Sequence, residues 1–369
     1  MKVCFLHKPY DTYLLTRARY LIEKGHKVYS IYYKSKYSSN YSSIKWSGTV
    51  ALGLSHDIFS KYLNRLLFPY IIAEFTKKHS IDIFHVQGML NSFYLPFSNA
   101  KKRVITNQGS DVIITANSYP ILKLGYRFFY CFVDAVVQDS IISQKNGIKL
   151  GAPKKNNKII EVGVDFNLFN PDVEEGIARK WMGITTATKM VFSSRGYTDL
   201  YNLETYIQSI PIIVKIIKNI KFVFANNSPG FMKKYRPLIC KLGIENHLIL
   251  AGQMDHDKMM PYYTKDADVV VSVPSSDSSP ASVYEAMACK TPVIISDLPW
   301  YRGKFEKNRD MVVVPVRDVE KLANAIIQVL IGEKAVDVDS AYETVFKNIN
   351  YETENRKLEL LYEKILSVS

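Results

Sequence analysis

The sequence predicts an α/β protein built from two doubly wound domains. Its 369 residues correspond to two domains of roughly 150 residues each, and 47% apolar with 22% charged residues is an ordinary globular composition. Short runs rich in β-branched and aromatic residues alternate along the chain with stretches of helical periodicity. Such alternation is typical of parallel sheets whose two faces are both covered by helices.

The first half of the chain carries this alternation from its beginning. Residues 3–7 form a short apolar run, and apolar residues at helical spacing follow between Leu14 and Ile22, up to Gly25. This pattern predicts a strand, a helix and a second strand that starts near Lys27. Further along we expect a helix over 62–78 and strands at 81–86, 104–106 and 135–137.

The second half repeats the pattern after a turn-rich stretch at 163–171. We place the domain boundary at about residue 170, so that a first domain spans 1–170 and a second spans 171–349. A final helix is expected over about 352–366. Strands are predicted at 190–194, 221–225, 248–251, 269–273 and 292–296, and helices over 174–181, 204–217 and 282–288.

Composition excludes several classes of protein. The sequence has no uncharged apolar run of about 18 residues, so it predicts no membrane-spanning helix. Only four consecutive apolar residues precede His7 and Lys8, too few for a signal peptide, and we therefore expect a cytoplasmic protein. Four scattered cysteines without metal-ligand spacing are expected to be buried apolar residues. The first strand-to-helix turn has no G-x-G-x-x-G motif, which argues against a dinucleotide oxidoreductase.

The positive charge of the chain is concentrated in its first half. Residues 1–165 hold 23 of the 48 Lys and Arg but only 10 of the 35 Asp and Glu, so the whole net charge of +13 lies there. Nucleic acid, an anionic membrane or a phosphate-bearing substrate would each suit this charge. The basic runs 101–103 and 154–158, and the mixture of basic and large apolar residues at 61–70, favour peripheral attachment to an anionic membrane. No nucleic-acid-binding motif is recognised, and we expect no nucleic-acid partner.

The most informative segment is 274–299. There a predicted strand ends in a loop rich in Ser, Pro and Asp, and Pro280 to Ser282 open a helix whose first-turn amides would be unpaired, which makes an anion site. Asp277 lies on the loop, and Glu285, eight residues later, is expected in the first turn of the helix. Backbone amides could hold a diphosphate while the carboxylates accept hydrogen bonds from sugar hydroxyls. The simpler alternative is a pair of acidic residues that only cap the helix.

This segment resembles the E-x7-E signature of the retaining group 1 glycosyltransferases of GT-B fold, with Asp277 in the first acidic position and Glu285 in the second. The resemblance extends over most of the chain, because further landmarks of the family occur in the family's order. They are His85-Val86-Gln87-Gly88, Gln108-Gly109-Ser110-Asp111, the interdomain turn at 163–171, Leu250-Ala251-Gly252-Gln253 and Asp297-Leu298-Pro299.

The sequence departs from the family pattern in three places. The family usually has an Arg followed about five residues later by a Lys, both binding the donor diphosphate; here Arg195 is present, but Leu200-Tyr201-Asn202 stands where the Lys is expected. Gln108 replaces a frequent His and cannot act as a general base. Lys8-Pro9-Tyr10-Asp11-Thr12 replaces the usual Gly-Gly loop.

The resemblance implies two Rossmann-like domains facing a central cleft, with the C-terminal helix, about 350–369, packed back on the first domain. It implies that the second domain binds a UDP- or GDP-sugar and that the first binds a polysaccharide, lipopolysaccharide or lipid-linked glycan acceptor. A hexose would be transferred with retention and without a metal or other cofactor. Arg195 and the amides of Ser282 and Val283 would bind the donor diphosphate, and Tyr201 and Asn202 would also belong to the donor site. Glu285 would hold the ribose and Asp277 the reacting sugar, with Gln108 and Asp111 on the acceptor side.

Some alternatives stay open at this stage. The departures from the pattern are compatible with a non-catalytic nucleotide- or glycan-binding protein, and a nucleotide-sugar 2-epimerase shares the fold. Asp266-Ala267-Asp268 resembles a metal-binding D-x-D motif, but we reject it because Asp266 should end a helix and no further metal ligand accompanies it. His85 at a strand end is more simply a hydrogen-bonded core residue, and Arg195 could form only a surface salt bridge.

Overall fold

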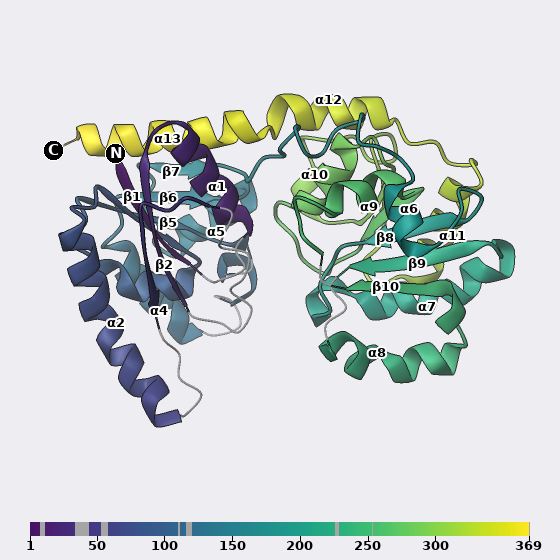
Figure 1. Cartoon of the computed structure of the whole chain (residues 1–369), viewed down its shortest axis with the longest axis horizontal. Coiled ribbons are helices and arrows are strands. Elements are labelled where there is room, and N and C mark those ends of the chain that lie inside the picture. The colour runs from purple at the N-terminus through teal and green to yellow at the C-terminus, as the bar shows by residue number, and fades with distance from the viewer. Residues whose placement is uncertain are drawn as a thin grey trace. The chain divides into compact units, whose positions relative to one another are not determined.

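The computed structural model describes residues 1–7, 12–33, 44–52, 58–109, 111–115, 120–225, 229–252 and 254–368. The chain divides into two compact units. The first unit contains Met1–Gly163 together with Glu352–Ser369, and the second contains Val164–Tyr351. Figure 1 shows each unit as a sheet flanked by helices.

The first unit is built on a parallel sheet of seven strands in the order β3-β2-β1-β4-β5-β6-β7. The chain therefore winds outward from β1 to β3, and then crosses back to β4 and winds the other way. The strands are β1 (Lys2–His7), β2 (Lys27–Tyr33), β3 (Gly48–Leu52), β4 (Ile83–Gln87), β5 (Lys102–Thr106), β6 (Ala135–Gln138) and β7 (Asn157–Ile159).

Helices and short helical turns connect these strands. Two of them are not α-helical: η2 is a 3₁₀ helix, and η3 is a short π-helical segment. The elements are α1 (Thr12–Glu23), α2 (Ile58–Lys78), η2 (Met89–Phe97), η3 (Asp111–Thr115), α4 (Pro120–Tyr130), α5 (Ile141–Lys149) and the C-terminal α13 (Tyr351–Ser367).

Helix α13 is anchored in the first unit by buried polar contacts. His85 of β4 bonds through Nδ1 to the Tyr362 hydroxyl at 2.5 Å and through Nε2 to Thr106 Oγ1 at 2.7 Å. Glu359 of the same helix accepts a hydrogen bond from the Tyr20 hydroxyl of α1 at 3.3 Å. His85 is fully buried, and burial, followed by the charge of Arg17, lowers its pKa well below the ordinary value. His85 is therefore a hydrogen-bonded core residue, as predicted.

The second unit contains a parallel sheet of six strands in the order β10-β9-β8-β11-β12-β13. Winding reverses between β8 and β11, just as it does between β1 and β4 in the first unit. The strands are β8 (Lys189–Ser193), β9 (Ile220–Ala225), β10 (Leu248–Gly252), β11 (Val269–Ser272), β12 (Val293–Ser296) and β13 (Val312–Val314).

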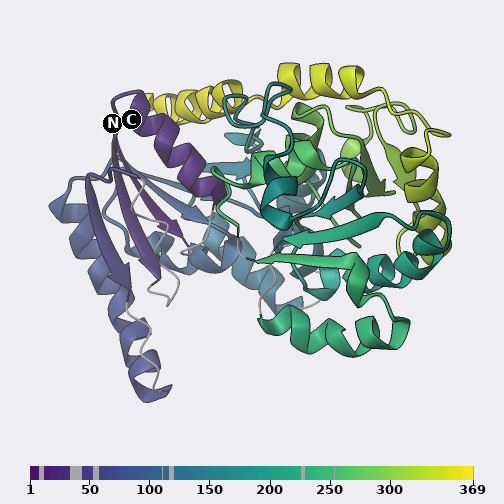
Figure 2. The ribbon, with the colours of Figure 1, turned by 45° about the vertical axis from the view of Figure 1, so that its right-hand side comes forward.

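Helices cover both faces of this second sheet (Figure 1, Figure 2). Successive strand residues divide between two apolar clusters: Phe192 packs with Tyr284 of α10, whereas Val191 packs with Ile207 of α7 and Leu322 of α11. Because side chains alternate across a strand, the two clusters are the two sides of the sheet. The helices are α6 (Ile177–Met182), η4 (Asp199–Tyr201), α7 (Leu203–Ile216), α8 (Pro229–Leu242), η5 (Glu245–His247), α9 (Met260–Asp266), α10 (Ala281–Ala288), η6 (Pro299–Tyr301), α11 (Val319–Leu330) and α12 (Val338–Asn348).

The break between the units falls at Gly163 and Val164 rather than at residue 170. Val164 donates its amide to the Ile349 carbonyl at 2.8 Å and accepts the Tyr351 amide at 2.9 Å. Phe169 is buried in the core of the second unit. These contacts assign 164–170 to the second unit.

Two further expectations are corrected. The charged helix expected over 174–181 is only α6, because Gly176 takes a left-handed conformation (φ 86°) and interrupts it at its start. Cys4 and Cys289 are buried as expected, but Cys131 and Cys240 are exposed.

Within the described ranges, no helix is both long and apolar enough to cross a membrane.

Candidate functional site

The predicted donor-binding residues lie where the winding of the second sheet reverses. Strands β8 and β11 are parallel neighbours that belong to opposite winding directions. Arg195 follows the carboxyl end of β8, and Asp277 lies in the loop that follows β11. In open α/β sheets ligands bind outside the carboxyl ends of the strands at such a reversal. The topology thus singles out this edge as the candidate site.

Arg195 and Asp277 meet at this edge. The Arg195 Nη2 lies 2.6 Å from Asp277 Oδ2, and the side chains are only 12% and 15% exposed. Arg195 also donates from Nε to the Ser272 hydroxyl at 2.7 Å, and Asp277 Oδ1 accepts the Ser278 amide at 2.9 Å. The pair joins the two strand ends, so Arg195 is a sheltered ion-pair partner rather than a surface cation.

Tyr201 and Asn202 support the same edge from the turn between β8 and α7. The Arg195 guanidinium lies over the Tyr201 ring, 5.5 Å from its centroid. Asn202 is buried, donates to the Val273 carbonyl at 3.0 Å and accepts the Ser275 hydroxyl at 2.8 Å. Tyr201, which stands where a Lys was expected, therefore orients Arg195, and Asn202 ties its turn to the loop that carries Asp277.

Helix α10 differs from the prediction at its start. It begins at Ala281, so Glu285 lies beyond its first turn, not in it. The Val283 amide is not unpaired either, because it donates to the Pro280 carbonyl at 2.9 Å, and the Val283 side chain is buried in the core. The Ser282 hydroxyl is buried and has no hydrogen-bond partner in the described part of the chain. Ser282 thus offers an unused polar group at the helix start.

Glu285 forms an ion pair that the sequence did not predict. Its Oε1 lies 2.9 Å from Nε2 of His256, and the Glu285 side chain is 12% exposed. Nδ1 of His256 lies 3.0 Å from Asp257 Oδ1. Burial lowers the pKa of His256, but Glu285 and then Asp257 raise it more strongly, to about 10 overall. The second acidic position of the signature is therefore paired with an imidazolium.

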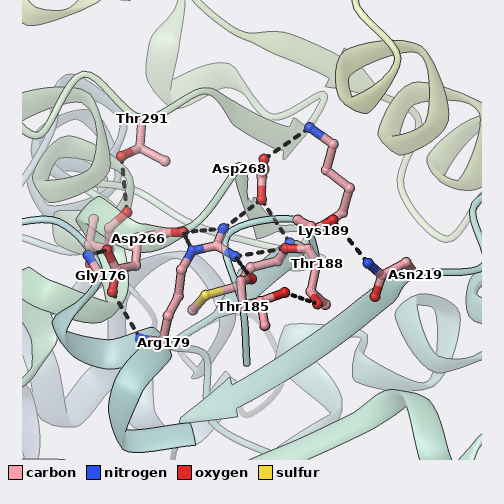
Figure 3. A network of polar contacts seen from close by, with 12 residues as sticks. Gly176, Arg179, Thr185, Thr188, Lys189, Asn219, Asp266, Asp268 and Thr291 are labelled. Carbon is pink, nitrogen blue, oxygen red and sulfur yellow. Dashed lines mark hydrogen bonds and ion pairs between the residues drawn. The ribbon is translucent and has the colours of Figure 1, made fainter. Parts of the chain in front are cut away.

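Asp266 and Asp268 are engaged in a structural network (Figure 3). Asp266 caps α6 by accepting the amides of Gly176 at 2.5 Å and Arg179 at 3.0 Å. Asp268 pairs with Arg179 at 2.8 Å and with Lys189 at 3.2 Å. These partners occupy both carboxylates of the D-x-D sequence. Across the residues that the structure describes, no group of three or more His, Cys, Asp or Glu forms a metal site.

In the first unit, Gln108 and Asp111 follow β5 and face the turn after β4. Asp111 Oδ2 accepts the amides of Met89 at 2.9 Å and of Gln108 at 3.3 Å. Gly88 has φ 81°, and a Cβ built on it would lie 3.5 Å from Asp111 Oδ2 and 3.7 Å from Gln108 Oε1. Asp111 therefore joins two strand-end turns. Ser110 and Lys8-Pro9-Tyr10-Asp11 lie outside the described residues.

Three members of these sites, His256, Ser272 and Gly88, are not among the site residues that the sequence predicts. Ser272 ends a buried strand and Gly88 follows one, at the end of the landmark His85-Val86-Gln87-Gly88; both positions indicate a sheet edge but no particular partner. His256 lies four residues after Gly252, which belongs to the landmark Leu250-Ala251-Gly252-Gln253. Its closeness to that landmark is the one feature of the sequence that points to His256. Its partner Glu285 is 29 residues away, so the pairing depends on tertiary structure.

Comparison with known proteins agrees with this topology. Residues 178–342 match the model of the family described as glycosyl transferases group 1. An uncharacterized glycosyltransferase of Methanocaldococcus jannaschii is 26% identical over 207 residues, which are 54% of this chain and 52% of that protein. The chain thus spans about half the length of this curated relative.

Two solved structures share the whole fold at low identity. Anabaena HepE in complex with UDP and glucose has a TM-score of 0.80 at 15% identity, over 99% of this chain and 100% of that one. WaaG, a glycosyltransferase involved in lipopolysaccharide biosynthesis, has a TM-score of 0.75 at 11% identity, over 98% and 99% of the two chains. The chain therefore has the GT-B fold, and residues 178–342 of its second unit match the family model of the group 1 glycosyl transferases.

Proposed function

We propose that the chain is a retaining hexosyltransferase that moves a sugar from a UDP- or GDP-sugar to a cell-surface polysaccharide, a lipopolysaccharide or a lipid-linked glycan. The second unit binds the donor and the first unit binds the acceptor. No metal or cofactor takes part in this scheme, and the nucleotide sugar is a co-substrate. The similar structures support a UDP-sugar and a glycan, since HepE binds UDP and glucose and WaaG is involved in lipopolysaccharide biosynthesis.

The observation that carries the proposal is the Arg195–Asp277 pair at the reversal of the second sheet. Departure of a nucleoside diphosphate needs a cation fixed in place before the reaction. Arg195 is fixed on three sides by Ser272, Asp277 and the Tyr201 ring. Asp277 in turn is the carboxylate that would lie against the reacting sugar and stabilise positive charge on it, as glycosyl transfer requires.

The start of α10 offers the diphosphate an uncharged hydrogen-bond donor in addition to the Arg195 cation. The Ser282 hydroxyl has no partner among the residues described, and the helix dipole favours an anion at this end. Val283 offers no free amide to the diphosphate, because its amide is bonded to Pro280; its buried side chain packs in the core. We therefore assign the diphosphate to Arg195 and Ser282, and the ribose hydroxyls to Glu285.

A second guanidinium reaches the turn where the expected Lys is missing. Arg317, which immediately precedes the N-cap of α11, donates from Nε to Asn202 Oδ1 at 3.2 Å. Its φ of 61° is a left-handed value that is costly for a residue with a side chain. Arg317 is our candidate for the charge that Tyr201 does not supply.

On the acceptor side we propose Gln108 and Asp111, and membrane attachment through an aromatic face. We define the aromatic face as the exposed large apolar side chains of α2, η2 and α4. They are Leu67, Tyr70, Leu90, Phe93, Phe97, Leu124 and Phe128. These are seven of the fifteen such side chains in the described chain, so their grouping favours an interface. The exposed Lys123 and Arg127 of α4 add charge that suits the anionic inner face of a cell membrane.

The test is a thermal-shift panel with UDP, GDP, CMP and ADP and their sugars, in EDTA, on wild type and Glu285→Ala. A bound ligand raises the melting temperature according to RT ln(1 + [L]/Kd). We expect UDP or GDP to raise the melting temperature of the wild type but not that of Glu285→Ala. Glu204→Ala, a change of an exposed glutamate, is the matched control and should still be stabilised. Sugar transfer by wild type and Asp277→Ala is then compared, and we expect turnover to fall far more than nucleotide affinity.

The remaining outcomes are equally informative. No stabilisation by any nucleotide, with or without added magnesium, would contradict the assignment of the donor site. Nucleotide binding without transfer to any glycan would favour the non-catalytic binding protein. An Asp277→Ala enzyme with unchanged turnover would remove Asp277 from the reaction, and interconversion of the donor's sugar epimers would indicate the 2-epimerase.

A further inference from the structure

We infer that His256 is a positioning residue of the donor site: its imidazole holds one oxygen of the Glu285 carboxylate and leaves the other to accept a ribose hydroxyl. The inference rests on the proposed function, because it assigns a mechanism to the ribose contact of Glu285. It extends the site to a residue that lies outside the acidic signature and between β10 and α9.

The turn that carries His256 is held by several hydrogen bonds. Asp255 Oδ1 accepts the amides of Asp257 at 3.1 Å and Lys258 at 3.2 Å, and the Asp255 carbonyl accepts the Met259 amide at 2.9 Å. Such a capped turn fixes the backbone of the residue that it encloses. His256 is therefore presented from a defined position.

The imidazole ring is held from two further directions. Nε2 lies 2.9 Å from Glu285 Oε1, and Nδ1 lies 3.0 Å from Asp257 Oδ1. The ring also packs against the buried ring of Phe169, with centroids 5.3 Å apart. Two carboxylates and an aromatic ring leave His256 little freedom to rotate.

Both ring nitrogens face carboxylates, which only the protonated ring can satisfy. A neutral imidazole has one donor and one acceptor nitrogen, whereas the imidazolium donates from both. The two carboxylates keep His256 charged by raising its pKa to about 10 against the effect of burial. His256 thus brings a lasting positive charge to the buried side chain of Glu285.

The remaining oxygen of Glu285 is the part available for a ligand. In the described part of the chain, Oε1 is bonded to His256 and Oε2 has no hydrogen-bond partner. A buried carboxylate that lacked His256 would have to turn toward water or take up a proton. Either change would remove the acceptor that we assign to the ribose.

A purely structural role predicts a different outcome. If His256 only linked the turn at 255–259 to α10, its removal would lower stability and weaken all nucleotides equally. A positioning role predicts a selective loss of the preference for a ribose hydroxyl. The two roles can therefore be separated by comparing a nucleotide with its deoxy form.

The experiment measures the Kd of UDP, dUDP, GDP and dGDP by calorimetry for the full chain. Whichever of UDP and GDP binds the wild type more tightly should have a Kd about tenfold lower than that of its deoxy form, as expected for a hydrogen bond to a charged group. In His256→Ala that ratio should fall to about one to two, and His256→Gln, which can still donate to Glu285, should recover part of it. His247→Ala is the matched control, since His247 bonds only to the Ile220 carbonyl at 3.1 Å among the residues described.

The outcomes distinguish the two proposals. If wild type and His247→Ala keep the tenfold ratio and His256→Ala keeps it too, the positioning role is overturned and the donor site stands. If wild type binds none of the four nucleotides, the donor site itself is wrong and the positioning role fails with it. A lowered ratio in His256→Ala, with the far-UV circular dichroism of wild type, supports the inference.

Discussion

Arg195 illustrates how one side chain can combine several contacts that no other residue type could make. It donates from Nε to Ser272, pairs through Nη2 with Asp277 and lies over the Tyr201 ring. A guanidinium is planar and has donors in a fixed fork, whereas an ammonium is a compact charge without a face. The geometry of Arg195, and not only its charge, is therefore adapted to this edge of the sheet.

Arg195→Lys should consequently separate geometry from charge. We expect the variant to fold and to lose about 10- to 100-fold in affinity for UDP or GDP, because one charge remains but the Nε bond and the stacking are lost. Calorimetry of the nucleotide and a melting curve check the result. Arg302→Lys, a change in the exposed partner of Asp297, should leave the affinity unchanged. Equal affinities in Arg195→Lys and wild type would contradict the assignment.

The charge of His256 makes the stability of the second unit depend on pH. Its pKa is about 10 in the folded chain, against about 6.5 in an unfolded one. Between these values the folded state binds more protons, so the free energy of unfolding decreases as pH rises from about 6.5 to about 10. Urea denaturation at pH 6 and pH 9.5 should show this decrease in wild type and a smaller one in His256→Gln. A pH dependence that is the same in both proteins would exclude His256 as its source.

At the level of single residues, the sequence predicted the site unevenly. Arg195, Asp277 and Asn202 were predicted, and the structure links them through hydrogen bonds between two strand ends and the loop after β11. His256 was not predicted, because the contact that defines it joins positions 29 residues apart. A sequence motif identifies residue types at fixed spacing, whereas a contact between side chains of different elements depends on how those elements pack.

At the level of elements, the sequence predicted most strands but only part of the helices. Strands β1, β2, β4–β6 and β8–β12 and helices α1, α2, α7, α10 and α13 lie within a few residues of their predicted positions, whereas α4, α5, α8, α9, α11 and α12 were not predicted. Strand β3 was missed because its residues alternate between exposed and half-buried, and β7 and β13 because each has only three residues. Helix α6 was overestimated because the left-handed Gly176 is visible only in the backbone geometry.

Two helical glycines of the first unit should respond in opposite ways to alanine. A Cβ on Gly125 of α4 would approach only Phe129, at 4.0 Å, whereas one on Gly147 of α5 would lie 2.5 Å from Nε2 of the fully buried Gln138. Alanine is preferred over glycine in helices by about 0.5–1 kcal/mol. Gly125→Ala should therefore raise the free energy of unfolding by roughly that amount, whereas Gly147→Ala should lower it by about 1–3 kcal/mol. Chemical denaturation of both variants checks this, and stabilisation by Gly147→Ala would contradict the packing described for α5.

At the level of the whole molecule, charge and apolar exposure are both asymmetric. The whole positive excess lies in residues 1–165, and the aromatic face lies on elements of that same half. Lipid binding usually needs two such contributions, one apolar and one electrostatic. The charge was evident from the sequence, but the aromatic face was not, because an apolar residue on a helix gives no sign of which face remains uncovered.

Membrane attachment can be tested by removing the apolar contribution alone. We expect wild type to float with vesicles of phosphatidylglycerol and phosphatidylcholine, and the double variant Phe93→Ser and Phe128→Ser to float at least about tenfold less. Phe346→Ser, at an exposed position of the second unit, is the matched control. Flotation of the double variant at the wild-type level would contradict the interface, and loss of flotation in high salt would confirm the electrostatic part.

The backbone contacts of Val164 give the second unit the character of an insertion. The chain enters that unit at Val164 and leaves it at Tyr351, and the two residues share a hydrogen bond of 2.9 Å. In engineering terms, the second unit is a cassette whose two ends meet. We expect that 164–351 could be excised with its two ends still adjacent, and that a short Gly-Ser bridge could rejoin the rest of the chain. Exchange of this cassette between relatives would then leave the sheet of the first unit unchanged.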